Sequence, residues 1–181
     1  KGGGWNRDAF RGNELRGKRL GILGMGRLGR MVAEYGRTFG MSVAAYDPYA
    51  SDWPMGVELR SAAKDLMEDA QVISIHVPLN DETKGLMDGD MLARLPPRAV
   101  LINTSRGGLI DEDALVRVMT AGHLAGAGLD VTETEPLPAD HPLRGLDRVI
   151  LTPHILGHTI DLYTVMPDVL VENATRIMKG D

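Results

Sequence analysis

Short apolar runs of strand length recur along the chain and alternate with amphipathic stretches of helix length. The runs are continuous rather than alternating, which is typical of strands buried on both faces of a parallel sheet. They span residues 19–23, 42–46, 71–77, 99–103, 124–131 and 148–152. Strands that alternate with helices predict βαβ units with right-handed crossovers. The pattern therefore predicts an α/β fold of the Rossmann type, a doubly wound parallel sheet with helices on both faces.

Four other stretches have the apolar spacing of helices. They cover residues 27–38, 61–68, 110–124 and 159–179. Gly40 and Gly122 stand where glycine commonly ends a helix. Pro167 lies inside the last stretch, and a proline there lacks the amide that a helix needs. We therefore expect a kink at Pro167 or two shorter helices.

Length and composition narrow the class of protein. With 181 residues and 43% hydrophobic side chains, the chain can form one core and one domain. A formal net charge of -5 disfavours a nucleic-acid partner. No apolar run approaches the length of a membrane span, so we expect no membrane partner. Cysteine is absent, which excludes thiol chemistry and fits a cytoplasmic protein.

Glycines in the spacing of a dinucleotide-binding loop join the first predicted strand to the first helix. They are Gly24, Gly26 and Gly29. The first permits a tight turn, the second lets the backbone approach a pyrophosphate, and the third lets helix and strand pack closely. The amides around Arg27 and Leu28 would then face the anion. The alternative is a purely structural turn.

Asp47 ends the second predicted strand, where a carboxylate can bind both hydroxyls of the adenosine ribose. The same carboxylate would repel a 2′-phosphate. Pro48 and Tyr49 follow it, so no cation is at hand to bind that phosphate. The sequence therefore favours NAD over NADP as the cofactor.

Three later strands end beside ionisable side chains. Arg106 follows the strand at 99–103, Asp130 and Glu135 follow the next, and His154 follows the last. In a doubly wound sheet, ligands bind beyond these strand ends. Taken singly, the arginine and the histidine are more often surface or structural residues than catalytic ones.

Together these side chains suit hydride transfer to a 2-oxo acid. An arginine can hold the carboxylate and the carbonyl with two parallel donors. A histidine can supply the proton for the forming alkoxide, and a carboxylate beside it fixes its tautomer and favours its protonated form. Arg106, Glu135 and His154 provide these parts. His154 and His158 also have the spacing of zinc ligands on a helix, but Pro153 disfavours that helix, and we expect no metal.

Several segments carry a family resemblance. They read "GNELRGKRLGILGMGRLGR", "SIHVPLNDETKGLM", "LINTSRGGLIDEDAL", "AGLDVTETEPLPADHPL" and "VILTPHILGHT". They resemble the NAD-binding domain of the D-isomer-specific 2-hydroxyacid dehydrogenases. The resemblance implies that Arg106 binds the substrate carboxylate and carbonyl, that His154 is the acid/base, and that Glu135 is its hydrogen-bonding partner.

The resemblance also implies contacts with the cofactor. Asp130 would hold the nicotinamide carboxamide, and Pro78 and Thr83 would line the adenosine half. The full set of expected contacts is Gly24, Gly26, Arg27, Leu28, Gly29, Asp47, His76, Pro78, Thr83, Thr104, Ser105, Arg106, Asp130, His154 and Gly157.

The same resemblance implies a domain organisation and partners. Residues 1–181 would be a single dinucleotide-binding domain, with a hinge segment at 1–17, a Rossmann core at 18–158 and a C-terminal helical segment at 159–181. The substrate domain would be absent from this chain. The substrate would be a small 2-hydroxy or 2-oxo acid such as hydroxypyruvate, glyoxylate or a phosphoglycerate-like acid, and the protein a homodimer through this domain. Two alternatives are an NAD-sensing, corepressor-like binding protein and a dimerisation scaffold.

Overall fold

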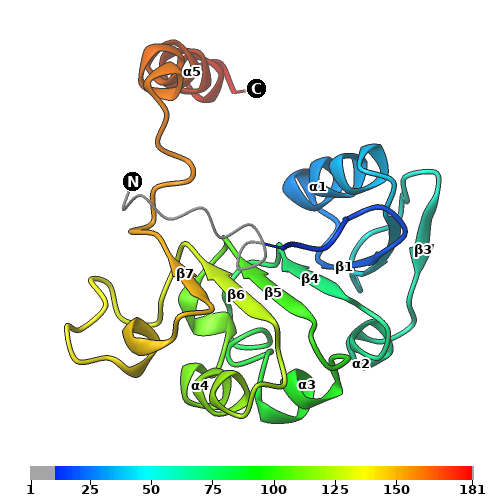
Figure 1. Cartoon of the computed structure of the whole chain (residues 1–181). Coiled ribbons are helices and arrows are strands. Elements are labelled where there is room, and N and C mark those ends of the chain that lie inside the picture. Colours follow the sequence, from blue (N-terminus) through cyan, green and yellow to red (C-terminus); the bar gives the residue numbers. More distant parts are fainter. Residues whose placement is uncertain (1–10, 181) are drawn as a thin grey trace.

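One parallel sheet organises the chain. The computed structural model describes residues 11–180, and its strands lie in the order β3-β2-β1-β4-β5-β6-β7 (Figure 1). Their bounds are β1 Arg19–Leu23, β2 Ser42–Tyr46, β3 Val57–Leu59, β4 Val72–Ile75, β5 Val100–Asn103, β6 Gly126–Leu129 and β7 Val149–Leu151. The strand order reverses between β1 and β4, so the chain winds outward on both sides of that point. Such a switch point leaves a crevice beyond the carboxyl ends of the strands.

Helices cover both faces of this sheet, as predicted. They are α1 Arg27–Thr38, α2 Ala63–Met67, α3 Gly89–Arg94, α4 Glu112–Thr120 and α5 Ile160–Lys179, with short 3-10 turns η2 Gly107–Leu109 and η3 Pro142–Gly145. The helix α1 lies on one face, while α2, α3 and α4 lie side by side on the other (Figure 1). Each face has its own apolar cluster. The Rossmann-type prediction is confirmed.

The apolar runs predicted six of the strands and missed β3. That strand is short and largely exposed at the sheet edge, so it has no buried apolar run to detect. The six-residue helix α3 was missed for a similar reason, because it is too short to show helical periodicity. The proposed boundaries at residues 17 and 158 stay predictions, and residues 1–10 of the hinge segment lie outside the described part of the chain.

Two shorter helices, one of the two outcomes expected at Pro167, do not form, and the expected kink stays a prediction. The helix α5 runs unbroken from Ile160 to Lys179 with Pro167 inside it. Nearly all of its side chains are exposed, so the carbonyl that loses its amide partner at the proline can be hydrated. Figure 1 shows α5 apart from the sheet, beyond an extended segment. Over residues 11–180 we find no helix with the length and apolarity needed to cross a membrane.

Candidate functional site

The predicted site residues lie along one edge of the sheet. The segments that carry them follow β1, β2, β4, β5, β6 and β7, and all of these strands are parallel. Their carboxyl ends therefore point the same way. The strand order places the glycine loop and the loop after β4 at the centre, Asp47 to one side, and Arg106, Asp130 and His154 in succession on the other.

The glycine loop has the geometry of a dinucleotide cradle. Gly24 has a φ of 92°, and a Cβ there would lie 2.6 Å from the carbonyl oxygen of His76. A Cβ on Gly29 would lie 2.0 Å from the carbonyl oxygen of Gly24, whereas one on Gly26 would meet open space. The helix α1 starts without a capping side chain and without an acidic residue in its first turn. Its exposed first amides are therefore available to an anion, and the loop fits a pyrophosphate.

Asp47 turns its carboxylate toward this loop. Its Oδ2 accepts a hydrogen bond from the amide of Met25 at 2.7 Å, and its Oδ1 accepts one from the amide of Tyr49 at 2.8 Å. Each carboxylate oxygen can accept a second hydrogen bond, so the group is held in place and still has capacity for ribose hydroxyls. The hydroxyl of Tyr49 donates to Glu82 at 2.6 Å, which links the loops after β2 and β4.

The loop after β4 holds His76, Pro78 and Thr83. Burial lowers the pKa of His76, whose Nε2 lies 2.8 Å from the hydroxyl of Ser74. The hydroxyl of Thr83 donates to the carbonyl of Pro78 at 2.6 Å and so closes the loop on itself. The loop is thus preformed beside Gly24. Its expected contacts with adenosine stay predictions.

A buried asparagine shapes the loop that carries Arg106. The side chain of Asn103 is fully buried, donates to the carbonyl of Arg106 at 2.9 Å and accepts from the amide of Ser105 at 3.0 Å. The hydroxyl of Ser105 donates to the carbonyl of Ile75 at 2.7 Å. These bonds tie the loop to β4 and leave the guanidinium of Arg106 exposed.

Asp130 holds the segment that carries His154. Its buried carboxylate accepts hydrogen bonds from the hydroxyl of Thr152 at 2.5 Å, the amide of Ile155 at 3.0 Å and the amide of Leu156 at 3.1 Å. Burial by itself would raise the pKa of Asp130, but these hydrogen bonds outweigh it and keep the pKa below its usual value. Three acceptor positions are thus used within the protein. The expected contact with the nicotinamide carboxamide stays a prediction.

His154 sits in a strained backbone conformation. Its φ is 53°, in the left-handed region that residues with a Cβ seldom adopt. Its amide donates to the carbonyl of Asp130 at 2.8 Å, so the contacts of Asp130 hold the strained turn in place. Such a conformation costs on the order of 1–3 kcal/mol and is found most often at functional sites.

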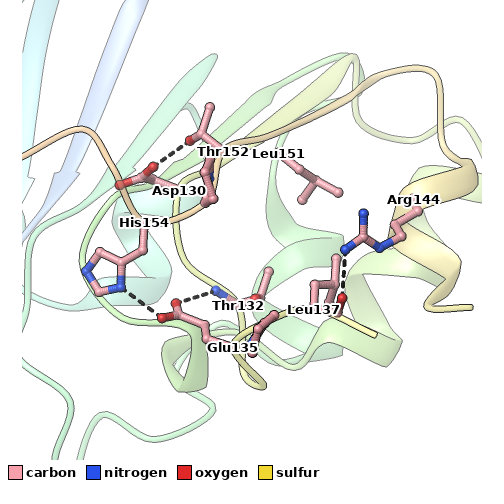
Figure 2. A pocket seen from close by; sticks show the side chains of 10 residues that line it. Asp130, Thr132, Glu135, Leu137, Arg144, Leu151, Thr152 and His154 are labelled. Atoms are coloured by element: carbon pink, nitrogen blue, oxygen red, sulfur yellow. Dashed lines mark hydrogen bonds and ion pairs between the residues drawn. The ribbon is translucent and has the colours of Figure 1, made fainter. Parts of the chain in front are cut away.

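Glu135 pairs with the imidazole of His154. The two partners lie 2.9 Å apart, from His154 Nδ1 to Glu135 Oε2, and the other carboxylate oxygen accepts from the amide of Thr132 at 3.1 Å (Figure 2). The hydrogen bond from His154 is the main cause that lowers the pKa of Glu135, and the charge of Arg106 adds to it. An ionised carboxylate only accepts, so Nδ1 carries a hydrogen and Nε2 is free to exchange a proton.

A cavity of about 550 Å³ adjoins this pair. Figure 2 shows His154 and Glu135 on one side of it and Leu137, Leu151 and Arg144 on the other. Its lining comprises Asp130, Thr132, Glu135, Pro136, Leu137, Arg144, Leu151, Thr152, Pro153 and His154. Two nitrogens of Arg144 donate to the carbonyls of Leu137 and Pro138, which braces the loop after Glu135.

The structure brings together residues that sequence reasoning did not single out. Asn103 and Thr152 belong to no expected site, although both are polar residues at the end of an apolar strand. His158, proposed and rejected as a zinc ligand, bonds to the hydroxyl of Tyr163 at 2.8 Å. Among residues 11–180, no group of three or more histidine or acidic side chains is arranged to hold a metal ion.

The fold and the glycine loop define a dinucleotide-binding domain of the Rossmann type. The chain belongs to the D-isomer specific 2-hydroxyacid dehydrogenases, whose NAD binding domain model matches residues 1–155. It is 44% identical over 160 residues to a D-3-phosphoglycerate dehydrogenase of Mycobacterium bovis, covering 87% of this chain and 30% of that protein. It is 42% identical over 180 residues to a (S)-sulfolactate dehydrogenase of Chromohalobacter salexigens, covering 97% of this chain and 58% of that protein.

A solved structure has a similar fold. The D-lactate dehydrogenase of Aquifex aeolicus, complexed with NAD and lactic acid, matches with a TM-score of 0.84 and 32% identity. The match covers 98% of this chain and 58% of that one. The chain thus spans between about a third and somewhat more than half of the relatives it matches.

Proposed function

We propose that this chain is the cofactor-binding and catalytic half of an NAD-dependent oxidoreductase that acts on D-2-hydroxyacids or 2-oxo acids. The observation that carries the proposal is the His154–Glu135 pair, held in a strained turn at the sheet edge that also carries Arg106 and the glycine loop. Family membership supports the same reaction class. The named relatives act on different small acids, so the individual substrate is left open.

The residues at the sheet edge fit the cofactor. The first amides of α1 would hold the pyrophosphate, Asp47 the adenosine ribose, and the segment around Asp130 the nicotinamide end. When bound, the nicotinamide supplies or accepts a hydride at the substrate carbon. The protein itself has to bind and orient the acid and to transfer the proton.

Three side chains would act on the substrate. Arg106 binds the carboxylate and polarises the carbonyl, which orients the acid at the site. In the reducing direction His154 gives the proton on Nε2 to the forming alkoxide, and it takes that proton back in the oxidising direction. Glu135 stabilises the imidazolium and fixes its orientation through Nδ1.

The test is turnover by the full-length protein. Purified protein, NADH and a panel of 2-oxo acids that includes hydroxypyruvate, glyoxylate and phosphohydroxypyruvate should give consumption of NADH at 340 nm. Tight NADH binding without turnover of any of them would overturn the enzyme and favour a binding protein of the corepressor kind. The same proposal includes a homodimer that forms through this domain and a cytoplasmic location. Sedimentation velocity of the full-length protein tests whether the homodimer forms.

Asp47 should decide the choice between NADH and NADPH. Removing its charge in Asp47→Ala relieves repulsion of a 2′-phosphate, worth roughly 1–2 kcal/mol for a partly solvated pair. The ratio of the NADPH to the NADH dissociation constant should therefore fall about tenfold, measured by calorimetric titration. The control Asp52→Ala removes an exposed charge nearby and should leave the ratio unchanged. Equal ratios in both variants would contradict the role of Asp47.

Glu135 should set the pH dependence of reduction. Its pKa is lowered, so the carboxylate is ionised through the neutral range and can stabilise the protonated imidazole there. The variant Glu135→Gln loses the charge that stabilises the imidazolium. The alkaline limb of the kcat profile for reduction should move to lower pH by about one unit. The control Asp140→Asn removes the charge of an exposed carboxylate in the same loop and should leave the pH profile in place. An unmoved pH profile in Glu135→Gln would refute the pairing of Glu135 with His154.

A further inference from the structure

The loop between β6 and β7 has to hold Glu135 in place, yet it has little regular structure. Apart from η3, residues 130–148 form no helix or strand. Most of their side chains are exposed, including that of Glu135 itself. A carboxylate on such a loop can orient His154 only if the backbone on both sides of it is anchored.

A buried carboxylate on α4 contacts this loop at two points. Glu112 lies in the first turn of α4 and is only 8% exposed. Its Oε1 accepts a hydrogen bond from the amide of Glu133 at 2.6 Å, and its Oε2 lies 3.3 Å from Nε2 of His141. Residues 133 and 141 flank the segment that carries Glu135, so Glu112 ties both of its ends to one helix.

The hydrogen bonds of His141 define its role. Its Nδ1 accepts from the amide of Leu143 at 3.3 Å and caps η3, so the hydrogen of the ring is on Nε2. The N–H on Nε2 therefore lies on the side of Glu112, while Nδ1 holds the start of η3. Burial raises the pKa of Glu112, and the hydrogen bond from Glu133 and the nearby His141 oppose that effect. The negative charges of Glu133 and Asp113 raise the pKa of Glu112 further. A buried carboxylate without these partners would be strongly unfavourable.

A backbone contact joins the same loop to the segment after Arg106. A Cβ on Gly107 would lie 1.9 Å from the carbonyl carbon of Thr132, so η2 packs directly on the backbone that leads to Glu135. The chain runs from η2 into α4 and its Glu112 within a few residues. The start of α4 is thus the common support of the loop with Arg106 and the loop with Glu135.

We propose that Glu112 and His141 are positioning residues of the reaction: they hold the Glu135 loop on α4 and so set how Glu135 orients His154. The inference rests on the proposed function. Neither residue lines the cavity beside His154.

The test measures turnover of the full-length protein. Glu112→Gln has one acceptor oxygen and cannot offer an oxygen to both the amide of Glu133 and Nε2 of His141. The kcat should therefore fall on the order of ten- to a hundredfold, as expected for a misplaced catalytic group. The dissociation constant of NADH should not change. The neighbouring variant Asp113→Asn removes a charge from the same helical turn without touching the loop and should keep wild-type kcat. His141→Gln keeps a side-chain N–H donor and should retain more activity than His141→Leu.

A double-mutant comparison separates positioning from general stability. If Glu112 acts through Glu135, adding Glu112→Gln to Glu135→Gln should cause no further loss of kcat. Amide hydrogen exchange should be faster at residues 131–141 in Glu112→Gln and unchanged at 24–38. Losses that multiply in the double variant, or unchanged exchange in the loop, would overturn the inference. An inactive wild-type protein would instead overturn the proposed function.

Discussion

His154→Asn in the full-length protein is expected to lower kcat for reduction of a 2-oxo acid about a thousandfold, since general acid catalysis contributes factors of roughly 10² to 10⁴. Asparagine can keep a hydrogen bond to Glu135 but cannot transfer a proton. Asparagine is also shorter, so it places no proton donor where Nε2 of His154 would face the substrate. Steady-state kinetics with saturating NADH measures this effect, and calorimetric titration of NADH should show that the cofactor still binds.

The chain contains a matched control for this variant. His158 lies in the same exposed segment and bonds to the hydroxyl of Tyr163, not to Glu135. His158→Asn should therefore keep wild-type kcat. If the two variants lose activity alike, the effect comes from the segment as a whole and the acid/base assignment to His154 is wrong.

Two glycines of the same loop should respond differently to alanine. Gly26→Ala places a methyl group in open space, and its φ of -70° suits alanine, so the free energy of unfolding should not change. That space is where the pyrophosphate would approach the backbone, and NADH affinity should fall about ten- to a hundredfold. Gly29→Ala places the methyl group 2.0 Å from the carbonyl oxygen of Gly24. It should lower both NADH affinity and, by about 1–3 kcal/mol, the free energy of unfolding.

Thermal unfolding and calorimetric titration on this chain distinguish the two effects. A loss of stability in Gly26→Ala equal to that in Gly29→Ala would show that both glycines are structural. Full NADH affinity in Gly26→Ala would show that the cofactor does not approach the loop there. Either result would contradict the cradle derived from the geometry.

Much of the fold follows from local patterns. A strand buried on both faces must be apolar along its whole length, so each such strand of this sheet was visible in the sequence. The bounds of α1 match the predicted 27–38 because an amphipathic helix repeats its apolar positions over three turns. The edge strand β3 and the helix α3 were not visible, since an exposed or very short element buries too little surface to leave a pattern.

The site was predictable in its parts but not in its connections. The glycine spacing and the carboxylate of Asp47 are local, and they point to a dinucleotide without any knowledge of the fold. The chemistry of hydride transfer suggested a carboxylate beside His154, and the family resemblance assigned that role to Glu135, which lies 19 residues away in the sequence. Nothing in the sequence indicated that Asp130 would bind the backbone around His154, or that Glu112 would reach the amide of Glu133 from 21 residues away.

The sequence by itself thus determined the doubly wound sheet, the dinucleotide loop and the family, because each depends on residues that are close in the chain. Only the tertiary structure decided which polar side chains hold others in place. The sheet sets the ends of β5, β6 and β7 side by side, and burial then requires each enclosed polar group to find a partner. Asn103, Glu112 and Asp130 find theirs on loops that pack together only after folding.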